Sequence, residues 1–208
     1  SYIIEGIKES SNIADAIITD SESSKNDIVE ALTYDSNKVF VVYLGIDHNL
    51  FSREDIPPLV PEEYILYVGG MTSRKGLPYL LEAFGRIKDR LPHKLVLIDG
   101  MGWRDPRIHK MIDEYNLSDR VVLKTAKTVE EMANYYRFAE LFVCPSLYEG
   151  FGLPPLEAMA CGCPVITSNN SSLKELYEEV AVLVDPLNTE ELAERIIEVI
   201  NNSQLRVK

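Results

Sequence analysis

The chain has 208 residues with 46% hydrophobic content and a formal net charge of −12, enough for one sizeable core or for one domain and part of a second. The acidic charge argues against a surface for nucleic acid or anionic membranes, because both need a basic face that neutralises phosphates. No apolar run approaches the roughly 20 residues that cross a bilayer and the N-terminus has no signal-peptide pattern, so we expect a cytoplasmic protein.

The first 50 residues have the pattern of an incomplete α/β unit. The stretch "ADAIITDSESSKNDIVEAL" predicts a strand, a cap at Ser21 or Ser23 and a helix, and "KVFVVYLGID" predicts a second strand that ends at Gly45. Residues 52–63 contain three prolines and indicate a linker. Because the chain begins with Ser1 rather than Met, we expect a piece of a longer protein. Residues 1–50 would then be the tail of another domain, and residues 51–208 a second domain.

From Tyr64 onward, short apolar runs alternate with amphipathic stretches. This pattern is typical of strand and helix units in a parallel sheet that is covered on both faces. Helices with one apolar stripe are predicted at 78–90, 129–138 and 192–200, and helix starts at Pro78, Pro106 and Pro154 or Pro155. Strands are predicted at 64–69, 94–98, 120–123, 141–144, 164–167 and 181–184. Six such strands suffice for a Rossmann-like, doubly wound α/β domain.

The loop after the first of these strands, "GGMTSRKGLP", combines glycines with two cations. Gly69 and Gly70 would let the backbone approach a ligand, and Arg74 and Lys75 come just before a helix. In open parallel sheets ligands bind beyond the carboxyl ends of the strands, so a pyrophosphate is the natural partner of this loop. The alternative is an ordinary solvated loop with two surface cations.

A second turn, "YEGFGLPPLE", also indicates an anion site. Gly150 and Gly152 free the backbone, and Pro154 or Pro155 opens a helix. The N-terminus of a helix carries about half a positive charge and unpaired N–H donors, which favour phosphate.

Two glutamates flank this turn, and we expect them to act on sugars. A carboxylate accepts several hydrogen bonds and donates none, so it suits neighbouring hydroxyl groups. Glu157, predicted on the first helical turn, would bind a ribose, and Glu149, before the turn, would face a hexose. The alternative makes Glu157 a partner of the helix dipole and Glu149 a capping group.

Neither a disulfide framework nor a metal site is expected. The three cysteines, Cys144, Cys161 and Cys163, are too few and odd in number for a framework, and the Cys-Gly-Cys pair lacks a second pair that would complete a zinc site. We expect all three to be buried small hydrophobes. No Asp-x-Asp occurs, so a divalent ion beside a nucleotide diphosphate has no visible ligands.

Together these motifs resemble the C-terminal, donor-binding domain of retaining glycosyltransferases of family 4, which have the GT-B architecture of two Rossmann-like domains. The resemblance covers nearly all of residues 10–200. It is carried by "VVYLGID", "YVGGMTSRKGLPYLLEAF" and above all "CPSLYEGFGLPPLEAMACGCPVITSNNSSLKEL".

The resemblance implies roles for the residues already singled out. Glu149 would contact the transferred sugar and Glu157 the ribose, and Lys75 would hold the diphosphate. The family often has an arginine where this chain has Gly70, and Arg74 is expected to substitute for it. The backbone amides that would line the sugar-phosphate site are those of Phe151, Gly152 and Leu153.

The resemblance also implies an activity and partners. The donor would be a nucleoside-diphosphate hexose, GDP-mannose or UDP-glucose, and the Arg-Lys pair favours GDP-mannose. No metal cofactor is expected. An N-terminal acceptor-binding domain would be the missing partner, and any membrane association would occur through it, so the fragment alone is expected to bind nucleotide sugar with little turnover. The exposed strands at 14–19 and 39–42 are expected to promote self-association. A non-catalytic nucleotide-sugar-binding module and a GT-B nucleotide-sugar epimerase are the alternatives.

Overall fold

A six-stranded parallel sheet organises residues 64–184. The computed structural model describes residues 2–54, 56–100, 102–103 and 105–202, so Ser1 and residues 203–208 of the predicted domains lie outside the described residues. The strands lie in the order β5-β4-β3-β6-β7-β8, and every predicted strand is present with its ends within one residue of the prediction. They are β3 (Tyr64–Val68), β4 (Lys94–Ile98), β5 (Val121–Lys124), β6 (Leu141–Cys144), β7 (Val165–Ser168) and β8 (Val182–Val184).

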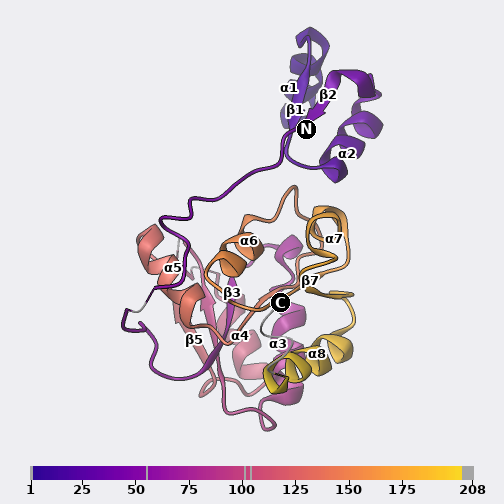
Figure 1. Cartoon of the computed structure of the whole chain (residues 1–208). Helices are drawn as coiled ribbons and strands as arrows, with labels where there is room; N and C mark the ends of the chain where they lie inside the picture. The colour runs from indigo at the N-terminus through magenta and orange to yellow at the C-terminus, as the bar shows by residue number, and fades with distance from the viewer. Residues whose placement is uncertain (1, 55, 101, 104, 203–208) are drawn as a thin grey trace.

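Helices connect these strands and cover both faces of the sheet (Figure 1). The helix predicted at 129–138 has those bounds, whereas α8 begins three residues before its apolar stripe because the Asn188 side chain accepts a hydrogen bond from the Glu191 amide and caps it. The residue pattern did not predict α7. The helices are α3 (Leu77–Ile87), α4 (Arg107–Glu114), α5 (Val129–Phe138), α6 (Leu153–Ala160), α7 (Ser171–Tyr177) and α8 (Thr189–Asn201).

Alternate strand residues face two separate cores, as the period of two in a strand requires. One core packs against α3, α4 and α8, and includes Ile65, Tyr67, Leu95, Leu97 and Val143. The other packs against α5, α6 and α7, and includes Tyr64, Leu66, Val96, Ile98 and Phe142. Burial on both faces explains why the strands are continuous apolar runs.

The strand order reverses between β3 and β6. The chain leaves the central strand β3 toward β4 and β5, and then returns to pair β6 with the other edge of β3. In open α/β sheets ligands bind at such a switch point, outside the carboxyl ends of the strands. The loops that follow β3 and β6 are the two that carry the predicted site residues.

Residues 2–41 form a smaller unit, drawn in indigo and violet at the top of Figure 1. It contains α1 (Tyr2–Ile13), β1 (Ile17–Thr19), α2 (Glu22–Leu32), a 3₁₀ turn η1 (Ser36–Lys38) and β2 (Val39–Val41). The helix α1 was not predicted, and β2 ends at Val41, not at Gly45. The strands β1 and β2 pair in parallel with each other, so each keeps one edge that pairs with no described strand.

The linker after this unit is attached to the larger domain. The Arg137 side chain on α5 donates to the carbonyls of Leu50 and Ser52 at 2.8 and 2.6 Å. Asn134 on the same helix accepts from the Leu59 amide and donates to the Pro57 carbonyl. Among the described residues, no helix is both long and apolar enough to cross a membrane.

Candidate functional site

The loop after β3 is built against the loop after β6. Gly76 has φ of +67°, and a Cβ there would lie 1.8 Å from the carbonyl oxygen of Pro145, so only glycine allows this approach. The Leu147 amide donates to the Arg74 carbonyl at 2.7 Å. The two loops therefore form one surface at the switch point of the sheet.

Tyr67 on β3 contacts the backbone of the loop that follows this strand. Its buried hydroxyl lies 3.3 Å from the Gly70 carbonyl oxygen and 3.4 Å from that of Lys75. Gly69 has φ of +148°, and a Cβ on Gly70 would come within 3.2 Å of the Asp99 carboxylate. Tyr67 was not predicted as a site residue, because in the sequence it is one more apolar member of a buried strand.

Arg74, Lys75 and Glu149 lie together, as predicted for residues of one site. Lys75 Nζ is 2.6 Å from Glu149 Oε1, and Arg74 Nη1 is 2.7 Å from Glu149 Oε2. The Ser146 hydroxyl also donates to Glu149 Oε1 at 2.7 Å. Two cations thus share one carboxylate at this edge, and the Asp99 carboxylate lies beside Gly70 of the same loop.

The protonation of Glu149 follows from these contacts. Burial by itself raises the pKa of Glu149, but the hydrogen bonds from Lys75 and Ser146 and the neighbouring cations outweigh burial and lower the pKa. The carboxylate is therefore ionised at neutral pH and acts as an acceptor. It does not cap α6, since that helix has no side-chain cap.

The turn after β6 presents three amides. Gly152 is the N-cap of α6 and has φ of +94°. A Cβ at this position would lie 2.6 Å from the Leu173 side chain, so the chain can enter the helix in this way only with glycine. Within the described part of the chain, the N–H groups of Phe151, Gly152 and Leu153 donate to no acceptor. Such groups at a helix start are the donors that bind anions.

Side chains on α7 hold the peptide units behind two of these amides. Ser172 donates to the Phe151 carbonyl at 3.1 Å, and Tyr177 donates to the Gly152 carbonyl at 2.6 Å. In a planar trans peptide the C=O and the following N–H point in opposite directions. The amides of Gly152 and Leu153 are thereby directed away from α7. Only the tertiary arrangement reveals this role of Ser172 and Tyr177.

The predicted place of Glu157 on the first helical turn is wrong, and Gly150 differs from Gly152. Gly150 does not have positive φ, so its backbone does not require glycine. Glu157 is the fifth residue of α6, because the helix begins at Leu153, and therefore lies beyond the first helical turn. Among the described residues Glu157 shares no hydrogen bond with Glu149, and its side-chain partner is Tyr136.

Glu157 has a separate environment. Its carboxylate accepts a hydrogen bond of 3.0 Å from the buried Tyr136 hydroxyl. Burial raises the pKa of Glu157, and the hydrogen bond from Tyr136 offsets part of this effect. Glu157 is therefore a half-buried hydrogen-bond acceptor on the face of the sheet that α6 covers.

All three cysteine thiols are free and buried, as predicted, and burial raises the pKa of Cys144. No group of three His, Cys, Asp or Glu side chains that could hold a metal ion is found among the described residues.

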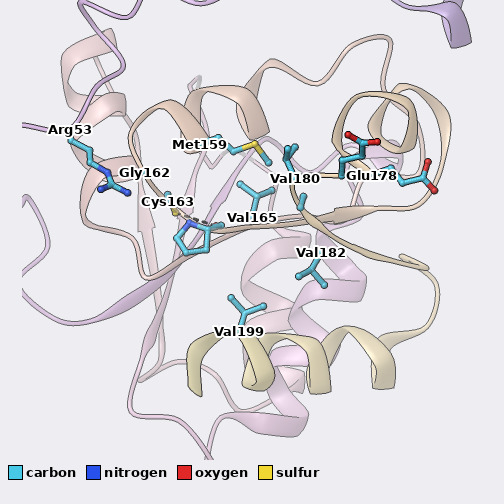
Figure 2. A pocket seen from close by; sticks show the side chains of 12 residues that line it. Arg53, Met159, Gly162, Cys163, Val165, Glu178, Val180, Val182 and Val199 are labelled. Carbon is cyan, nitrogen blue, oxygen red and sulfur yellow. Dashed lines mark hydrogen bonds between the residues drawn. The ribbon is translucent and has the colours of Figure 1, made fainter. Parts of the chain in front are cut away.

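A hollow lies at the end of the sheet where β7 and β8 begin, opposite the end that carries the glycine loops (Figure 2). Its volume is about 160 Å³, and Arg53 from the linker, Met159 and Cys163 are among its lining residues. A Cβ on Gly162 would come within 2.0 Å of Arg53 Nε, so this glycine makes room for the linker's guanidinium group. The linker thus contributes Arg53 to the lining of this hollow, which lies at the other end of the sheet from the glycine loops.

The fold defines the class of protein. Six parallel strands flanked by helices match the C-terminal domains of GT-B glycosyltransferases. A model of the family described as "Glycosyl transferases group 1" matches residues 51–208. The chain belongs to this family of glycosyltransferases.

Individual relatives support this assignment. The chain is 29% identical to O-antigen chain mannosyltransferase B of Escherichia coli, over 99% of this chain and 56% of that protein. It is 33% identical to the MMP alpha-(1->4)-mannosyltransferase of Mycolicibacterium hassiacum, over 85% and 43%. The structure of sucrose-phosphate synthase from Thermosynechococcus elongatus has a TM-score of 0.83 at 30% identity, over 98% and 54%. The chain thus spans about half the length of each.

Proposed function

We propose that this chain is the donor-binding part of a retaining glycosyltransferase of family 4, which transfers a hexose from a nucleoside-diphosphate sugar to an acceptor. The observation that carries the proposal is the meeting of Lys75, Arg74 and three unpaired amides at the switch point of the sheet. Cations and amides directed at one place suit a diphosphate.

Lys75 and Arg74 bind the diphosphate in this proposal. Without donor, both cations contact Glu149, and on donor binding they exchange this carboxylate for the diphosphate oxygens. Arg74 takes the role of the arginine that Gly70 replaces, because it reaches the same carboxylate as Lys75. Because Gly69 and Gly70 have no side chains, the backbone of this loop leaves room for the phosphates.

The amides of Phe151, Gly152 and Leu153 contact the sugar phosphate, and Glu149, once released, accepts hydrogen bonds from hexose hydroxyls. Glu157 accepts hydrogen bonds from the ribose, with Tyr136 holding its carboxylate from behind. The nucleobase lies against the backbone of residues 124–128. None of these contacts requires a metal ion.

The chemistry follows from fixed charges. The bond between the anomeric carbon and the diphosphate oxygen breaks, and both electrons go to the leaving oxygen. Once the nucleotide sugar is bound, the cations and amides already contact the phosphates and stabilise this charge without further rearrangement, and one such hydrogen-bond donor is typically worth ~2.7 to 4 kcal/mol. In the retaining mechanism the departing phosphate takes the proton of the acceptor hydroxyl, which attacks the same face of the sugar.

The mannosyltransferases among the relatives favour GDP-mannose as donor, with UDP-glucose as the second choice. Residues 1–50 are the tail of an acceptor-binding domain in this proposal, and the acceptor binds between the two domains in the cytoplasm. The chain alone therefore binds donor with little turnover.

Calorimetry with GDP-mannose, UDP-glucose, GDP and UDP tests the proposal. We expect one nucleotide series to bind, and Lys75→Ala to weaken its binding at least tenfold, since a charge-assisted contact is lost. Lys110→Ala, an exposed lysine on α4, is the matched control. Absence of binding by all four ligands, or equal effects of the two substitutions, contradicts the proposal.

A further inference from the structure

Glu175 on α7 supplies acceptors to the start of a helix far away in the sequence. Its Oε1 accepts from the Glu22 amide at 2.9 Å, and its Oε2 accepts from the Ser23 amide at 2.8 Å. The first N–H groups of a helix have no partner within the helix. The segment's own cap, Ser21, satisfies only the next amide, that of Ser24, at 3.0 Å. Glu175 therefore completes the cap of α2.

The capped end of α2 contacts the turn of residues 149–153, here called the donor turn. The Ser21 hydroxyl donates to the Gly150 carbonyl at 2.6 Å, and the Ser24 hydroxyl donates to the same oxygen at 3.1 Å. Ser21 is fully buried by this contact. On either side of Gly150, Tyr148 donates to Asp27 of α2 at 2.5 Å, and the ring of Phe151 lies 6.3 Å from that of Tyr43.

The carbonyl of Gly150 belongs to the same peptide unit as the Phe151 amide. Because the unit is planar and trans, the two hydroxyls that hold the carbonyl also set the direction of the Phe151 N–H. The carbonyls of Phe151 and Gly152, behind the other two unpaired amides, are held from α7 by Ser172 and Tyr177. Of the three amides, that of Phe151 is oriented from the N-terminal unit.

We propose that Glu175 is a positioning residue for donor binding: by capping α2 it keeps the Ser21 and Ser24 hydroxyls on the Gly150 carbonyl, and so directs the Phe151 amide toward the sugar phosphate. The inference rests on the proposed function of the turn. It makes the N-terminal unit part of the donor site through its hydrogen bonds to the Gly150 carbonyl.

Tyr43 reports on the same contact. Its hydroxyl donates to Glu175 Oε1 at 3.1 Å, and this hydrogen bond raises the pKa of Tyr43. The carboxylate thus joins both the start of α2 and the segment after β2 to α7. A carboxylate is well suited to this place, since negative charge is favourable at the N-terminus of a helix.

The test compares Glu175→Ala with Glu178→Ala in the full chain. Glu178 is an exposed glutamate three residues further on, and its side chain has no hydrogen bond or ion pair within the described residues. We expect Glu175→Ala to speed hydrogen exchange at the Glu22 and Ser23 amides about fivefold, the effect typical for loss of one helix cap. We expect it to weaken donor binding by a similar factor, and Glu178→Ala to change neither.

A double-mutant cycle separates positioning from a general structural effect. If Glu175 acts through the serine hydroxyls, Ser24→Ala weakens donor binding, and the combination with Glu175→Ala weakens it by less than the product of the two single effects. Glu175→Gln, which keeps a neutral acceptor oxygen, recovers part of the affinity.

The outcomes are distinguishable. Binding by the unmodified chain with an unchanged affinity in Glu175→Ala overturns the positioning role and leaves the proposed function standing. Effects of Glu175→Ala and Ser24→Ala that multiply fully overturn the route through Gly150. Failure of the unmodified chain to bind any nucleotide overturns the proposed function and the positioning role with it, whatever the exchange rates.

Discussion

The two parallel sheets of this chain are built from the same kind of unit and have very different cores. In the larger sheet Ile65 and Leu66 are fully buried on opposite faces, and α3 buries six of its residues. In the smaller sheet Ile18 and Phe40 are 73% and 54% exposed. None of the residues of α2 is buried. A strand-helix-strand pattern therefore predicts elements, but their packing depends on a second layer and on more strands.

The comparison also shows what holds the smaller unit in place. A two-stranded sheet is marginal on its own, and α2 is joined to the larger domain by hydrogen bonds with Gly150, Glu175 and Tyr148. The smaller region thus depends on the donor turn, while the larger region has a core of its own.

The largest expected effect contrasts two phenylalanines. Phe84→Ala, at a fully buried position of α3, should lower the free energy of unfolding by about 3 to 5 kcal/mol, because it leaves a cavity. Phe40→Ala in the smaller sheet should change it by no more than about 0.5 kcal/mol. Urea denaturation followed by circular dichroism measures both. Equal losses would mean that the two sheets are packed alike.

Two glycines of the turn where the regions meet provide a smaller contrast. Gly152→Ala should cost about 1 to 2 kcal/mol, since its φ of +94° suits only glycine. Gly150→Ala should be within about 0.5 kcal/mol, because a Cβ there meets Ser24 and Asp20 only at ordinary contact distances. Thermal unfolding of both variants is the measurement. A larger loss in Gly150→Ala would contradict the backbone conformation of the turn.

Two tyrosine hydroxyls extend the comparison to single hydrogen bonds. Tyr177→Phe removes the donor to the Gly152 carbonyl and should cost about 1 kcal/mol of unfolding free energy, as expected for a buried hydrogen bond. Tyr43→Phe removes an exposed bond to Glu175 and should cost less than about 0.5 kcal/mol. Denaturant titration of the two variants measures both losses of unfolding free energy. A larger loss for Tyr43→Phe than for Tyr177→Phe would contradict this order.

The smallest effect concerns pH at Glu157, whose pKa burial raises above the ordinary value of 4.5. A carboxyl group with a raised folded-state pKa stabilises the fold fully below its unfolded pKa, and this contribution is lost as pH rises through the folded pKa. Glu157→Gln should therefore stabilise the chain at pH 7 relative to the unmodified protein. The gain should shrink as pH falls through the raised folded-state pKa and be absent below the ordinary value of about 4.5. Unfolding measured at pH 7 and at pH 4 checks the sign. Greater stabilisation at the lower pH would contradict it.

Much of the candidate site could be predicted because its residues follow strands. Arg74, Lys75 and Glu149 come after β3 and β6, and the carboxyl ends of parallel strands meet at one edge. The position of Glu157 on α6 was misjudged by one or two residues, since the helix begins at Leu153 and not at either proline. Tyr67, Ser172 and Glu175 were not predicted as site residues, because each looks like an ordinary strand or helix residue in the sequence.

The six strands, the helices with an apolar stripe and the two glycine turns follow from the order of amino acids, since periodicity and turn chemistry are local properties of the chain. Tertiary contacts determine which amides are left without acceptors and which side chains hold the peptides behind them. They also bring Glu175 to the start of a helix 153 positions earlier. Hydrogen bonds between such distant residues leave no period in the sequence. They depend on the arrangement of loops and helices around the sheet, which exists only after the chain has folded.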